Sequence, residues 1–324
     1  NKKYHSQDLS KYKFLVTGGA GFIGSNIVEY LLRYNVGLVR VLDNLSNGYY
    51  ENIKEFINLP NFEFIKGDIR DLETCQKSIK DINFVLHQAA LGSVPRSITN
   101  PILTNDVNNN GFLNILVSLK ESNSLKRLVY AASSSTYGDS KVLPKIEGSE
   151  GKPLSPYAVT KYVNELYADV FSSIYGIHSI GLRYFNVFGP KQNPNNPYAA
   201  VIPIFTNHFF NNSIPTINGD GLTSRDFTFI ENVVQANIKS LFIKGLDTHK
   251  VYNIAYGNRV SLNEVISCLR EITGKNIKPI YREERIGDIK HSEANIDLAK
   301  RDFGYKPNIN FRKGLEIYFK QFYK

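Results

Sequence analysis

A glycine-rich segment between an apolar run and an amphipathic run constrains this chain more than any other feature of its sequence. Residues 13–18 (KFLVTG) have the composition of a buried strand, and residues 22–33 (FIGSNIVEYLLR) have the apolar spacing of a helix. The junction places Gly18, Gly21 and Gly24 three residues apart. Glycines at this spacing permit a tight turn, close approach of a diphosphate to the backbone and close packing of the helix, whose first N–H groups face the anion. The segment therefore predicts a βα unit that binds a dinucleotide.

Two acidic residues follow this segment at the ends of later predicted strands. Asp43 lies 22 residues after Gly21. A carboxylate in this position accepts hydrogen bonds from both ribose hydroxyls and repels a 2′-phosphate, so the sequence favours NAD over NADP. Asp68, in KGDI, is expected near the adenine, although a turn at a strand end would explain it nearly as well.

The glycine-rich unit is the first of a series in which β-rich runs alternate with helix-permissive segments. This alternation is typical of an α/β fold with a parallel, doubly wound sheet. Strands that are apolar on both faces also require helices on both sides of the sheet. The predicted strands are residues 13–18, 38–44, 62–68, 84–90 and 127–133.

The alternation becomes irregular after IGLRYFNVFGP, where KQNPNNPYAAVIP introduces several Pro and Asn residues. We therefore predict an NAD-binding domain at residues 1–182 and, mainly at residues 183–324, a smaller mixed α/β domain that binds the substrate. Residues 226–256 again have sheet and helix patterns, so we expect them to return to the first domain.

Charge and cysteine content argue against several other functions. The chain has 39 Lys and Arg against 30 Asp and Glu, a net charge of +9, but the basic residues are spread out, so no nucleic-acid partner is expected. It has no apolar run of 18 residues, so no membrane association is expected. Cys75 and Cys268 lie far apart without a CxxC motif, so neither a disulfide framework nor a metal site is predicted, and a cytoplasmic location is expected.

The segment SPYAVTKYVNELYADVF, residues 155–171, predicts a helix with Tyr157 and Lys161 on one face. Upstream, the fifth predicted strand ends in AASSSTYGD, a row of hydroxyls that includes Ser133. Positive charge near a phenol favours the phenolate, so we expect the pKa of Tyr157 to fall by roughly 1 to 3 units from about 10. Such a phenol can act as a general base at neutral pH. YxxxK alone is common on exposed helices. Its context favours a catalytic role, because the helix starts at Pro156 after a strand end rich in hydroxyls, where the nicotinamide of the cofactor should lie.

The motifs TGGAGFIG, Ser or Thr before YG, and YxxxK together resemble the extended short-chain dehydrogenase/reductase enzymes that act on nucleotide sugars. The finer motifs HQAALGSVPRS, AASSSTYGD, GLRYFNVFGP, SRDF and RIGDIKHS look most like those of bacterial UDP-N-acetylglucosamine 4-epimerases. In such enzymes the catalytic Ser or Thr lies four residues before the Tyr of YG, which gives Ser133 here. Nucleotide-sugar 4,6-dehydratases carry an Asp-Glu pair immediately after it, and Ser134 and Ser135 at these positions disfavour dehydration.

The resemblance implies a Rossmann-type fold and a 4-epimerase that interconverts UDP-N-acetylglucosamine and UDP-N-acetylgalactosamine through a transient 4-keto sugar. Tyr157 would take the proton of the 4-hydroxyl while NAD accepts the hydride, and both would return after the keto sugar turns over. The same reaction on UDP-glucose and UDP-galactose, or on a UDP-hexosaminuronic acid, is the near alternative. A catalytically idle NAD-binding regulator is a distant one, because a regulator needs none of Ser133, Tyr157 and Lys161.

The resemblance also implies the residues of the site. The catalytic residues are Tyr157, Lys161 and Ser133. The residues expected around NAD are Gly18, Gly21, Phe22, Ile23, Gly24, Asp43, Asn44, Asn47, Gly48, Asp68, Ile69, Gln88, Ala89, Ala90, Asn105, Lys161 and Tyr184. The residues expected around the UDP-sugar are Gly92, Ser93, Ser133, Ser134, Ser135, Tyr157, Asn186, Ala200, Val201, Asn218, Arg225, Arg285, Asp288 and Ser292.

Within the substrate set, the resemblance assigns Arg225 and Arg285 to the phosphates, for which the planar guanidinium is well suited. It sets Ser292 against the carbon-2 substituent of the sugar, where enzymes restricted to UDP-glucose and UDP-galactose tend to carry Tyr. Thr216 stands where relatives often have an aromatic residue near the uracil, so the base contact is less well defined.

A homodimer is the last expectation from the resemblance. The predicted helices at residues 111–122 and 157–171 have apolar faces that pair with their copies as a four-helix bundle in this family. An ordinary buried helix face would have the same pattern, so dimerisation rests on the resemblance alone.

Overall fold

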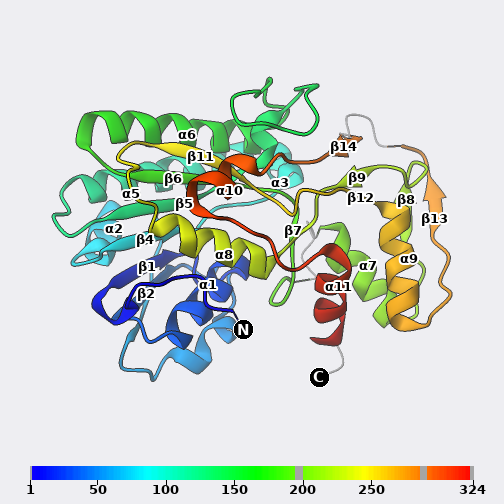
Figure 1. The fold of residues 1–324 in the computed structure, drawn as a ribbon, viewed down its shortest axis with the longest axis horizontal. Helices are drawn as coiled ribbons and strands as arrows, with labels where there is room; N and C mark the ends of the chain where they lie inside the picture. The colour runs from blue at the N-terminus through cyan, green and yellow to red at the C-terminus, as the bar shows by residue number, and fades with distance from the viewer. Residues whose placement is uncertain (1, 194–199, 285–289, 322–324) are drawn as a thin grey trace.

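The computed structural model describes residues 2–193, 200–284 and 290–321 of the chain. A seven-stranded parallel sheet forms the centre of the larger part of the molecule, and a smaller part of short strands and helices lies beside it (Figure 1). The strands of the central sheet, in spatial order, are β11 (Lys250–Ile254), β6 (Ser179–Tyr184), β5 (Arg127–Ser133), β4 (Phe84–His87), β1 (Lys13–Thr17), β2 (Leu38–Asp43) and β3 (Phe62–Lys66).

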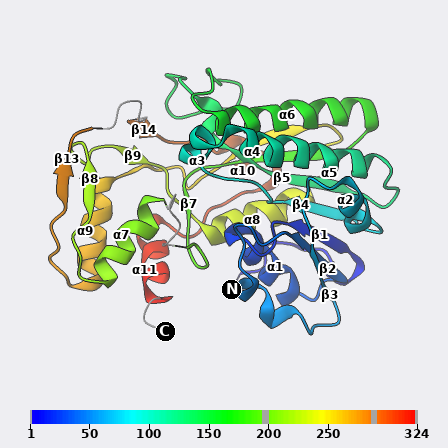
Figure 2. The ribbon, with the colours of Figure 1, turned by 180° about the vertical axis from the view of Figure 1, so that it is seen from behind.

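Apolar residues on both faces of this sheet explain its two layers of helices. In β1, Phe14 and Val16 belong to one core cluster and Leu15 belongs to another, because successive side chains of a strand point to opposite faces. Helices lie on both sides of the sheet (Figures 1 and 2). The α/β, doubly wound fold predicted from the sequence is therefore confirmed. On one side lie α1 (Phe22–Arg33) and α8 (Ile230–Leu241), and on the other α2 (Leu72–Ile79), α5 (Gly111–Lys120) and α6 (Pro156–Tyr175).

The strand order creates a crevice at the carboxyl ends of the central strands β1 and β4. From β1 the chain proceeds to β2 and β3 in one direction, whereas β4, β5 and β6 extend in the other. The connections that leave the carboxyl ends of β1 and β4 therefore diverge, and ligands of doubly wound sheets bind where the order reverses in this way. The turn after β1 is the glycine-rich segment.

Helix α6 is defined by strong signals at both ends. At its start the Ser155 side chain accepts a hydrogen bond from the Ala158 N–H, and Pro156 occupies the first helical position. At its end Gly176 adopts a left-handed conformation with a φ of 66°. The helix packs against β5 and β6, so Tyr157 near its start lies beside the carboxyl end of β5.

The helices next to α6 are joined through an unusual turn. Helix α3 (Val94–Thr99) is followed by α4 (Pro101–Asn105), a π-helical turn η4 (Asp106–Asn110) and then α5. In this turn the buried Asn108 side chain accepts from the Leu91 N–H at 2.8 Å and donates to the Thr160 hydroxyl at 3.0 Å. Asn108 thus ties the loop after β4 to helix α6, and a π turn often marks such a functional region.

The smaller part of the molecule is made of short elements. Its strands pair as β7 (Val187–Phe188) with β10 (Thr228–Phe229), β8 (Thr216–Asn218) with β13 (Ile280–Arg282), and β9 (Ser224–Arg225) with both β12 (Val260–Ser261) and β14 (His291–Ser292). Its helices are α7 (Val201–Phe210), α9 (Leu262–Thr273) and α11 (Phe311–Lys320), while α10 (Asp297–Phe303) packs against β11. Single helical turns are η1 (Leu9–Lys11), η2 (Tyr50–Asn52), η3 (Lys54–Phe56) and η5 (Ser134–Tyr137).

Candidate active site

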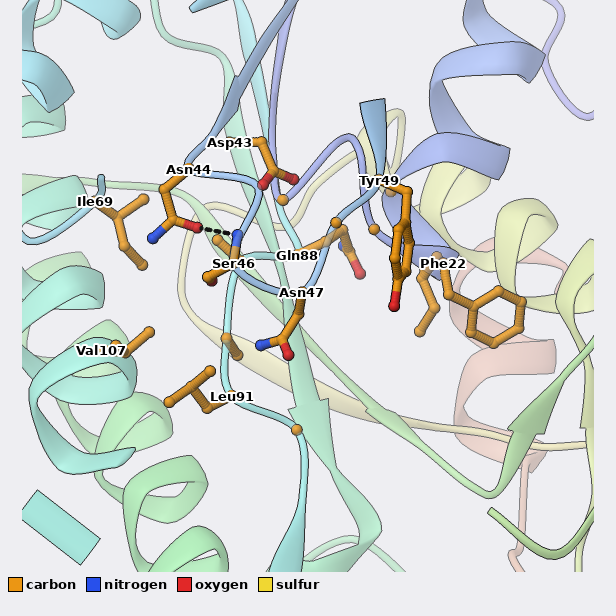
Figure 3. A pocket seen from close by; sticks show the side chains of 18 of the residues that line it. Phe22, Asp43, Asn44, Ser46, Asn47, Tyr49, Ile69, Gln88, Leu91 and Val107 are labelled. Carbon is orange, nitrogen blue, oxygen red and sulfur yellow. Dashed lines mark hydrogen bonds between the residues drawn. The ribbon is translucent and has the colours of Figure 1, made fainter. Parts of the chain in front are cut away.

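A cavity of about 350 Å³ lies at the carboxyl ends of β1, β2 and β4 (Figure 3). Its position coincides with the crevice that the strand order creates. Most of the residues predicted to surround NAD line this cavity. They are Gly18, Gly21, Phe22, Ile23, Gly24, Asp43, Asn44, Asn47, Gly48, Asp68, Ile69, Gln88, Ala89 and Ala90.

The glycines of the turn after β1 fit a bound dinucleotide. Gly18 has a φ of +66°, and a Cβ there would lie 2.7 Å from the backbone nitrogen of Ala89. A Cβ on Gly24 would lie 2.2 Å from the carbonyl oxygen of Gly18. The turn can therefore be this tight only with glycine at both positions, and it exposes the first turn of α1 to the cavity.

Asp43 is held at the end of β2 by backbone donors. Its carboxylate accepts from the Ala20 N–H at 2.9 Å and from the Leu45 N–H at 2.8 Å. Burial raises the pKa of Asp43, and these two hydrogen bonds oppose that effect. Each carboxylate oxygen keeps a further lone pair, so Asp43 can still accept from ribose hydroxyls at the cavity wall.

The carboxylate of Asp68 has protein partners of its own. Arg70 pairs with it at 2.7 Å, and the Asn44 side chain donates to it at 2.8 Å. The hydrogen bond from Arg70 is the main reason that the pKa of Asp68 falls to about 2. Asp68 lines the cavity, but its contacts favour the turn-forming role that the sequence had left open.

Three predicted cofactor residues are outside the cavity lining. Asn105 lies on α4, where its side chain accepts from Asn109. The Tyr184 hydroxyl contacts Gln88 at 3.1 Å, so it supports a lining residue. Lys161 points its ammonium group to the Ala131 carbonyl oxygen at 2.7 Å.

Several lining residues were not predicted from the sequence. The segment after β7 reaches the cavity because the Lys191 amine pairs with Glu29 of α1 at 3.0 Å and the Pro190 carbonyl accepts from Asn26. No local sequence signal marks this contact, since it joins parts of the chain that are far apart. The unpredicted lining residues are Leu42, Ser46, Tyr49, Gly67, Leu91, Arg96, Val107, Lys191, Gln192 and Asn193.

The three predicted catalytic residues meet at the carboxyl end of β5. Ser133 is the last residue of the strand, and its hydroxyl forms a hydrogen bond with the Tyr157 phenol. Lys161 is 3% exposed, and this burial lowers its pKa to about 8. The ammonium form therefore prevails at neutral pH and is lost as the pH rises through about 8.

The sequence predicts a lowered pKa for Tyr157, and this is wrong when only the surrounding protein residues are considered. Burial raises the pKa of Tyr157 above its ordinary value, and only the hydrogen bond from Ser133 opposes the rise. Lys161 does not offset the burial, and its ammonium group donates to the Ala131 carbonyl oxygen at 2.7 Å. Helical spacing placed the two residues on one face but did not decide which electrostatic effect is larger.

Part of the predicted substrate set lies in or beside the cavity. Gly92, Ser93 and Ala200 line it, and the Ser93 side chain also caps α3 by accepting from the Arg96 N–H. In the turn after β5, the hydroxyl and N–H of Ser135 both donate to the Ser133 hydroxyl oxygen, at 2.9 and 3.2 Å. Ser135 therefore fixes the rotamer of Ser133.

The remaining substrate candidates come from the turn region around η5 and from the smaller part of the molecule. Arg225 on β9 is the register partner of Ser292 on β14, and its guanidinium donates to the Ser224 and Lys290 carbonyls. Arg285 and Asp288 lie outside the described residues. The other candidates are Ser134 in η5, Asn186 with a φ of 35°, Val201 at the start of α7 and Asn218 at the end of β8.

Comparison with known proteins places these observations in a family. Residues 14–255 match the NAD dependent epimerase/dehydratase family. A UDP-N-acetylglucosamine 4-epimerase from Methanobrevibacter ruminantium, solved with UDP-N-acetylmuramic acid, is 38% identical with a TM-score of 0.90 over 96% of this chain and 98% of its own.

Two further solved structures have other substrates. A Thermotoga maritima UDP-glucose 4-epimerase, solved with UDP-glucose, is 33% identical with a TM-score of 0.89 over 96% of this chain and 98% of its own. A Bacillus cereus UDP-glucuronic acid 4-epimerase, solved with UDP-glucuronic acid and NAD, is 30% identical with a TM-score of 0.87 over 96% of this chain and 100% of its own.

The family match extends from β1 to the end of β11 and includes the glycine-rich turn, Asp43, Ser133 and the helix of Tyr157 and Lys161. NAD is the cofactor of the family, so the preference for NAD inferred from Asp43 is confirmed. Among the described residues, no helix is both long and apolar enough to span a membrane. The chain belongs to the NAD-dependent epimerase/dehydratase family.

Proposed function

We propose that this protein is a UDP-sugar 4-epimerase whose substrates are UDP-N-acetylglucosamine and UDP-N-acetylgalactosamine. The observation that carries the proposal is the hydrogen-bonded pair of Ser133 and Tyr157 beside the cofactor cavity. Ser134 and Ser135 follow this pair, so the turn lacks the acidic side chains that a dehydratase needs to expel water. This favours epimerisation over dehydration within the family.

Each of the three residues has a definite part in such a reaction. When bound, NAD supplies the acceptor for the hydride of carbon 4 and then the source from which it is returned. Tyr157 takes the proton of the 4-hydroxyl and later gives it back, while Ser133 donates a hydrogen bond to the same sugar oxygen. Lys161 is the ammonium group proposed to favour the phenolate during the reaction, although in this structure it donates to the Ala131 carbonyl and does not offset the burial of Tyr157.

The N-acetyl preference is supported by Ser292, which is the register partner of Arg225 on the neighbouring strand. Ser292 is small and partly buried, which leaves room for a carbon-2 acetamido group. The relatives solved with UDP-glucose and UDP-glucuronic acid make these sugars the alternatives to test. The decisive experiment is an epimerase assay of the purified protein with UDP-glucose, UDP-galactose, their two N-acetylated counterparts, UDP-glucuronic acid and the UDP-hexosaminuronic acids. A preference for a sugar that lacks the acetamido group would contradict the proposal.

Tight retention of NAD is the first expected result. Because the hydride returns to the same sugar, the cofactor is not consumed and has no need to exchange. Denatured protein should release NAD(H) in nearly stoichiometric amount, measured by an enzymatic cycling assay. Gly18→Val should release less than about a tenth of this, since its Cβ would meet the Ala89 backbone at 2.7 Å. Strict dependence of activity on an added stoichiometric oxidant would contradict the epimerase cycle.

We also propose a homodimer, with one change from the sequence-based expectation. Helix α5 turns its apolar residues into the core, where Phe112, Ile115 and Leu116 are fully buried. The exposed apolar side chains instead belong to α4 and α6, which lie side by side (Figure 2). We define this apolar face as Ile102, Val159, Leu166, Val170 and Ile174.

The apolar face predicts how the dimer can be dissociated. Ile102 is 83% and Ile174 is 65% exposed, so a partner copy would remove a large apolar area from water. Ile102→Asp combined with Val170→Asp should convert the dimer into a monomer in light scattering after gel filtration. Ile280→Asp, on an exposed position of β13, should leave it dimeric. A wild-type monomer, or a double variant that stays dimeric, would contradict this assignment.

A further inference from the structure

A buried arginine with no part in the cavity lining connects the elements that carry the catalytic residues. Arg183 lies on β6 and is 2% exposed. Two acidic residues neutralise it, Glu165 of α6 and Glu150 of the loop before α6. A buried ion pair is costly to desolvate and contributes little net stability compared with apolar residues of similar volume, so its use here needs another reason.

The first connection is to the helix of Tyr157 and Lys161. The Arg183 Nε donates to one carboxylate oxygen of Glu165 at 2.8 Å and Nη2 donates to the other at 2.6 Å. This bidentate geometry fixes both the position and the orientation of the carboxylate. Glu165 lies four and eight residues after Lys161 and Tyr157, on the same face of α6. The ion pair therefore fixes the helix face that carries both catalytic side chains against β6.

The second connection is to the turn of Ser133. The Arg183 guanidinium stacks over the ring of Tyr137, with its central carbon 4.9 Å from the ring centroid. Tyr137 closes the turn that begins after Ser133, and its hydroxyl donates to the Asn253 side chain at 2.7 Å. Cation–π contact and hydrogen bond together hold this turn in place. The Arg183 guanidinium is thus connected to both catalytic hydroxyls indirectly. Glu165 connects it to the helix of Tyr157, and Tyr137 connects it to the turn that follows Ser133.

We propose that Arg183 and Glu165 are positioning residues of the reaction, which fix Tyr157 against Ser133 and set a negative charge on the helix face that carries Lys161. The inference rests on the proposed epimerase function. Neither residue lines the cavity, and both act through the residues that they hold.

The negative charge that Glu165 sets on this helix face can be measured through the pKa of Lys161. Glu165 is the charged group whose field acts against the burial of Lys161 and raises its pKa, and Arg183 together with Glu150 surrounds that carboxylate. From β4, His87 also faces Lys161, but burial lowers the pKa of His87 to about 3, so it is neutral. The Ala131 carbonyl on β5, which accepts from the Lys161 ammonium group, carries no formal charge, and neither does Tyr157, one helical turn before Lys161, at neutral pH. Removal of the Glu165 charge should therefore lower the pKa of Lys161.

The test is the pH profile of kcat for Glu165→Gln, which keeps the shape of the side chain and one acceptor oxygen. Lys161 must be an ammonium, so activity is lost as the pH rises through its pKa. We expect this alkaline limb to move down by about one pH unit, the smallest shift usual for a nearby opposite charge. The loss of the ammonium form should then lower kcat about twofold at neutral pH and about tenfold at a pH above both pKa values, whereas KM for the UDP-sugar should change less than about twofold. Glu165→Asp, which keeps the charge, should restore the position of the limb.

Two further variants separate positioning from stability. Arg183→Gln combined with Glu165→Gln removes the bidentate pair as a whole and leaves only Glu150, the more exposed of the two carboxylates, without its arginine. It should therefore fold even if Glu165→Gln does not, and its alkaline limb should move in the same direction. Arg127→Met removes a buried arginine from the other end of β5, where it donates to four carbonyl oxygens. It should lower the melting temperature but leave the limb in place. A folded Glu165→Gln or double variant with an unmoved limb overturns the inference, whereas a wild type inactive on every UDP-sugar overturns the proposed function instead.

Discussion

Tyr157→Phe should reduce the turnover of UDP-N-acetylglucosamine by on the order of 100 to 10,000-fold, the usual contribution of a general acid or base. The substitution keeps the ring and its packing at the start of α6 and removes only the hydroxyl that contacts Ser133. Binding of UDP should barely change, because the proposed nucleotide contacts lie in the smaller part of the molecule. Steady-state kinetics and UDP titration by calorimetry measure the two effects separately.

The neighbouring residues provide the matched comparison. Lys161→Ala should reduce both the rate and the retained NAD(H), since Lys161 is proposed to contact the cofactor as well as to support the phenolate. Tyr175→Phe, at the exposed end of the same helix, should have the activity of the wild type. Turnover of Tyr157→Phe within about threefold of the wild type would mean that YxxxK is only a surface pattern here.

The parts of this fold that follow from local sequence were predictable. The run at residues 38–44 corresponds to β2, which ends at Asp43, because an apolar strand followed by a turn needs no distant contact to be recognised. The glycine-rich turn was predictable for the same reason, since glycines at three-residue spacing between a strand and a helix are a local signal, although Gly18 also lies against Ala89 beyond the end of β4. These signals were enough to favour NAD and the doubly wound sheet.

Other features depend on contacts between distant segments. Lys191 lines the cavity and pairs with Glu29 of α1. Arg183 on β6 contacts Tyr137 of η5 and Glu165 of α6, which are separate elements. The pKa of Tyr157 was misjudged because spacing along a helix reveals a nearby charge but not the burial that outweighs it. The helix face on α5 was likewise read correctly as apolar, but only its packing shows that it is buried.

Ser292→Tyr should abolish most epimerisation of UDP-N-acetylglucosamine while it spares or improves that of UDP-glucose. Ser292 is partly buried on β14 in register with Arg225, the proposed phosphate ligand, so it stands where the sugar would follow the diphosphate. Overpacking a closed site costs typically about 1 to 3 kcal/mol, enough for roughly 10 to 100-fold discrimination. Because the added ring would fill only the space of the acetamido group, the penalty should appear in kcat/KM for the acetylated sugar alone.

A matched variant tests whether volume is the cause. Ser292→Ala removes the hydroxyl without adding bulk, so it should keep the preference for the acetylated sugar within about threefold. Ser292→Tyr should also retain NAD(H) as the wild type does, because β14 lies outside the cofactor cavity. If Ser292→Tyr lowered activity equally on UDP-glucose and UDP-N-acetylglucosamine, or left both activities unchanged, then Ser292 would not face carbon 2. The N-acetyl preference would then have to come from the loop of Gly92 and Ser93, which lines the cavity at the end of β4.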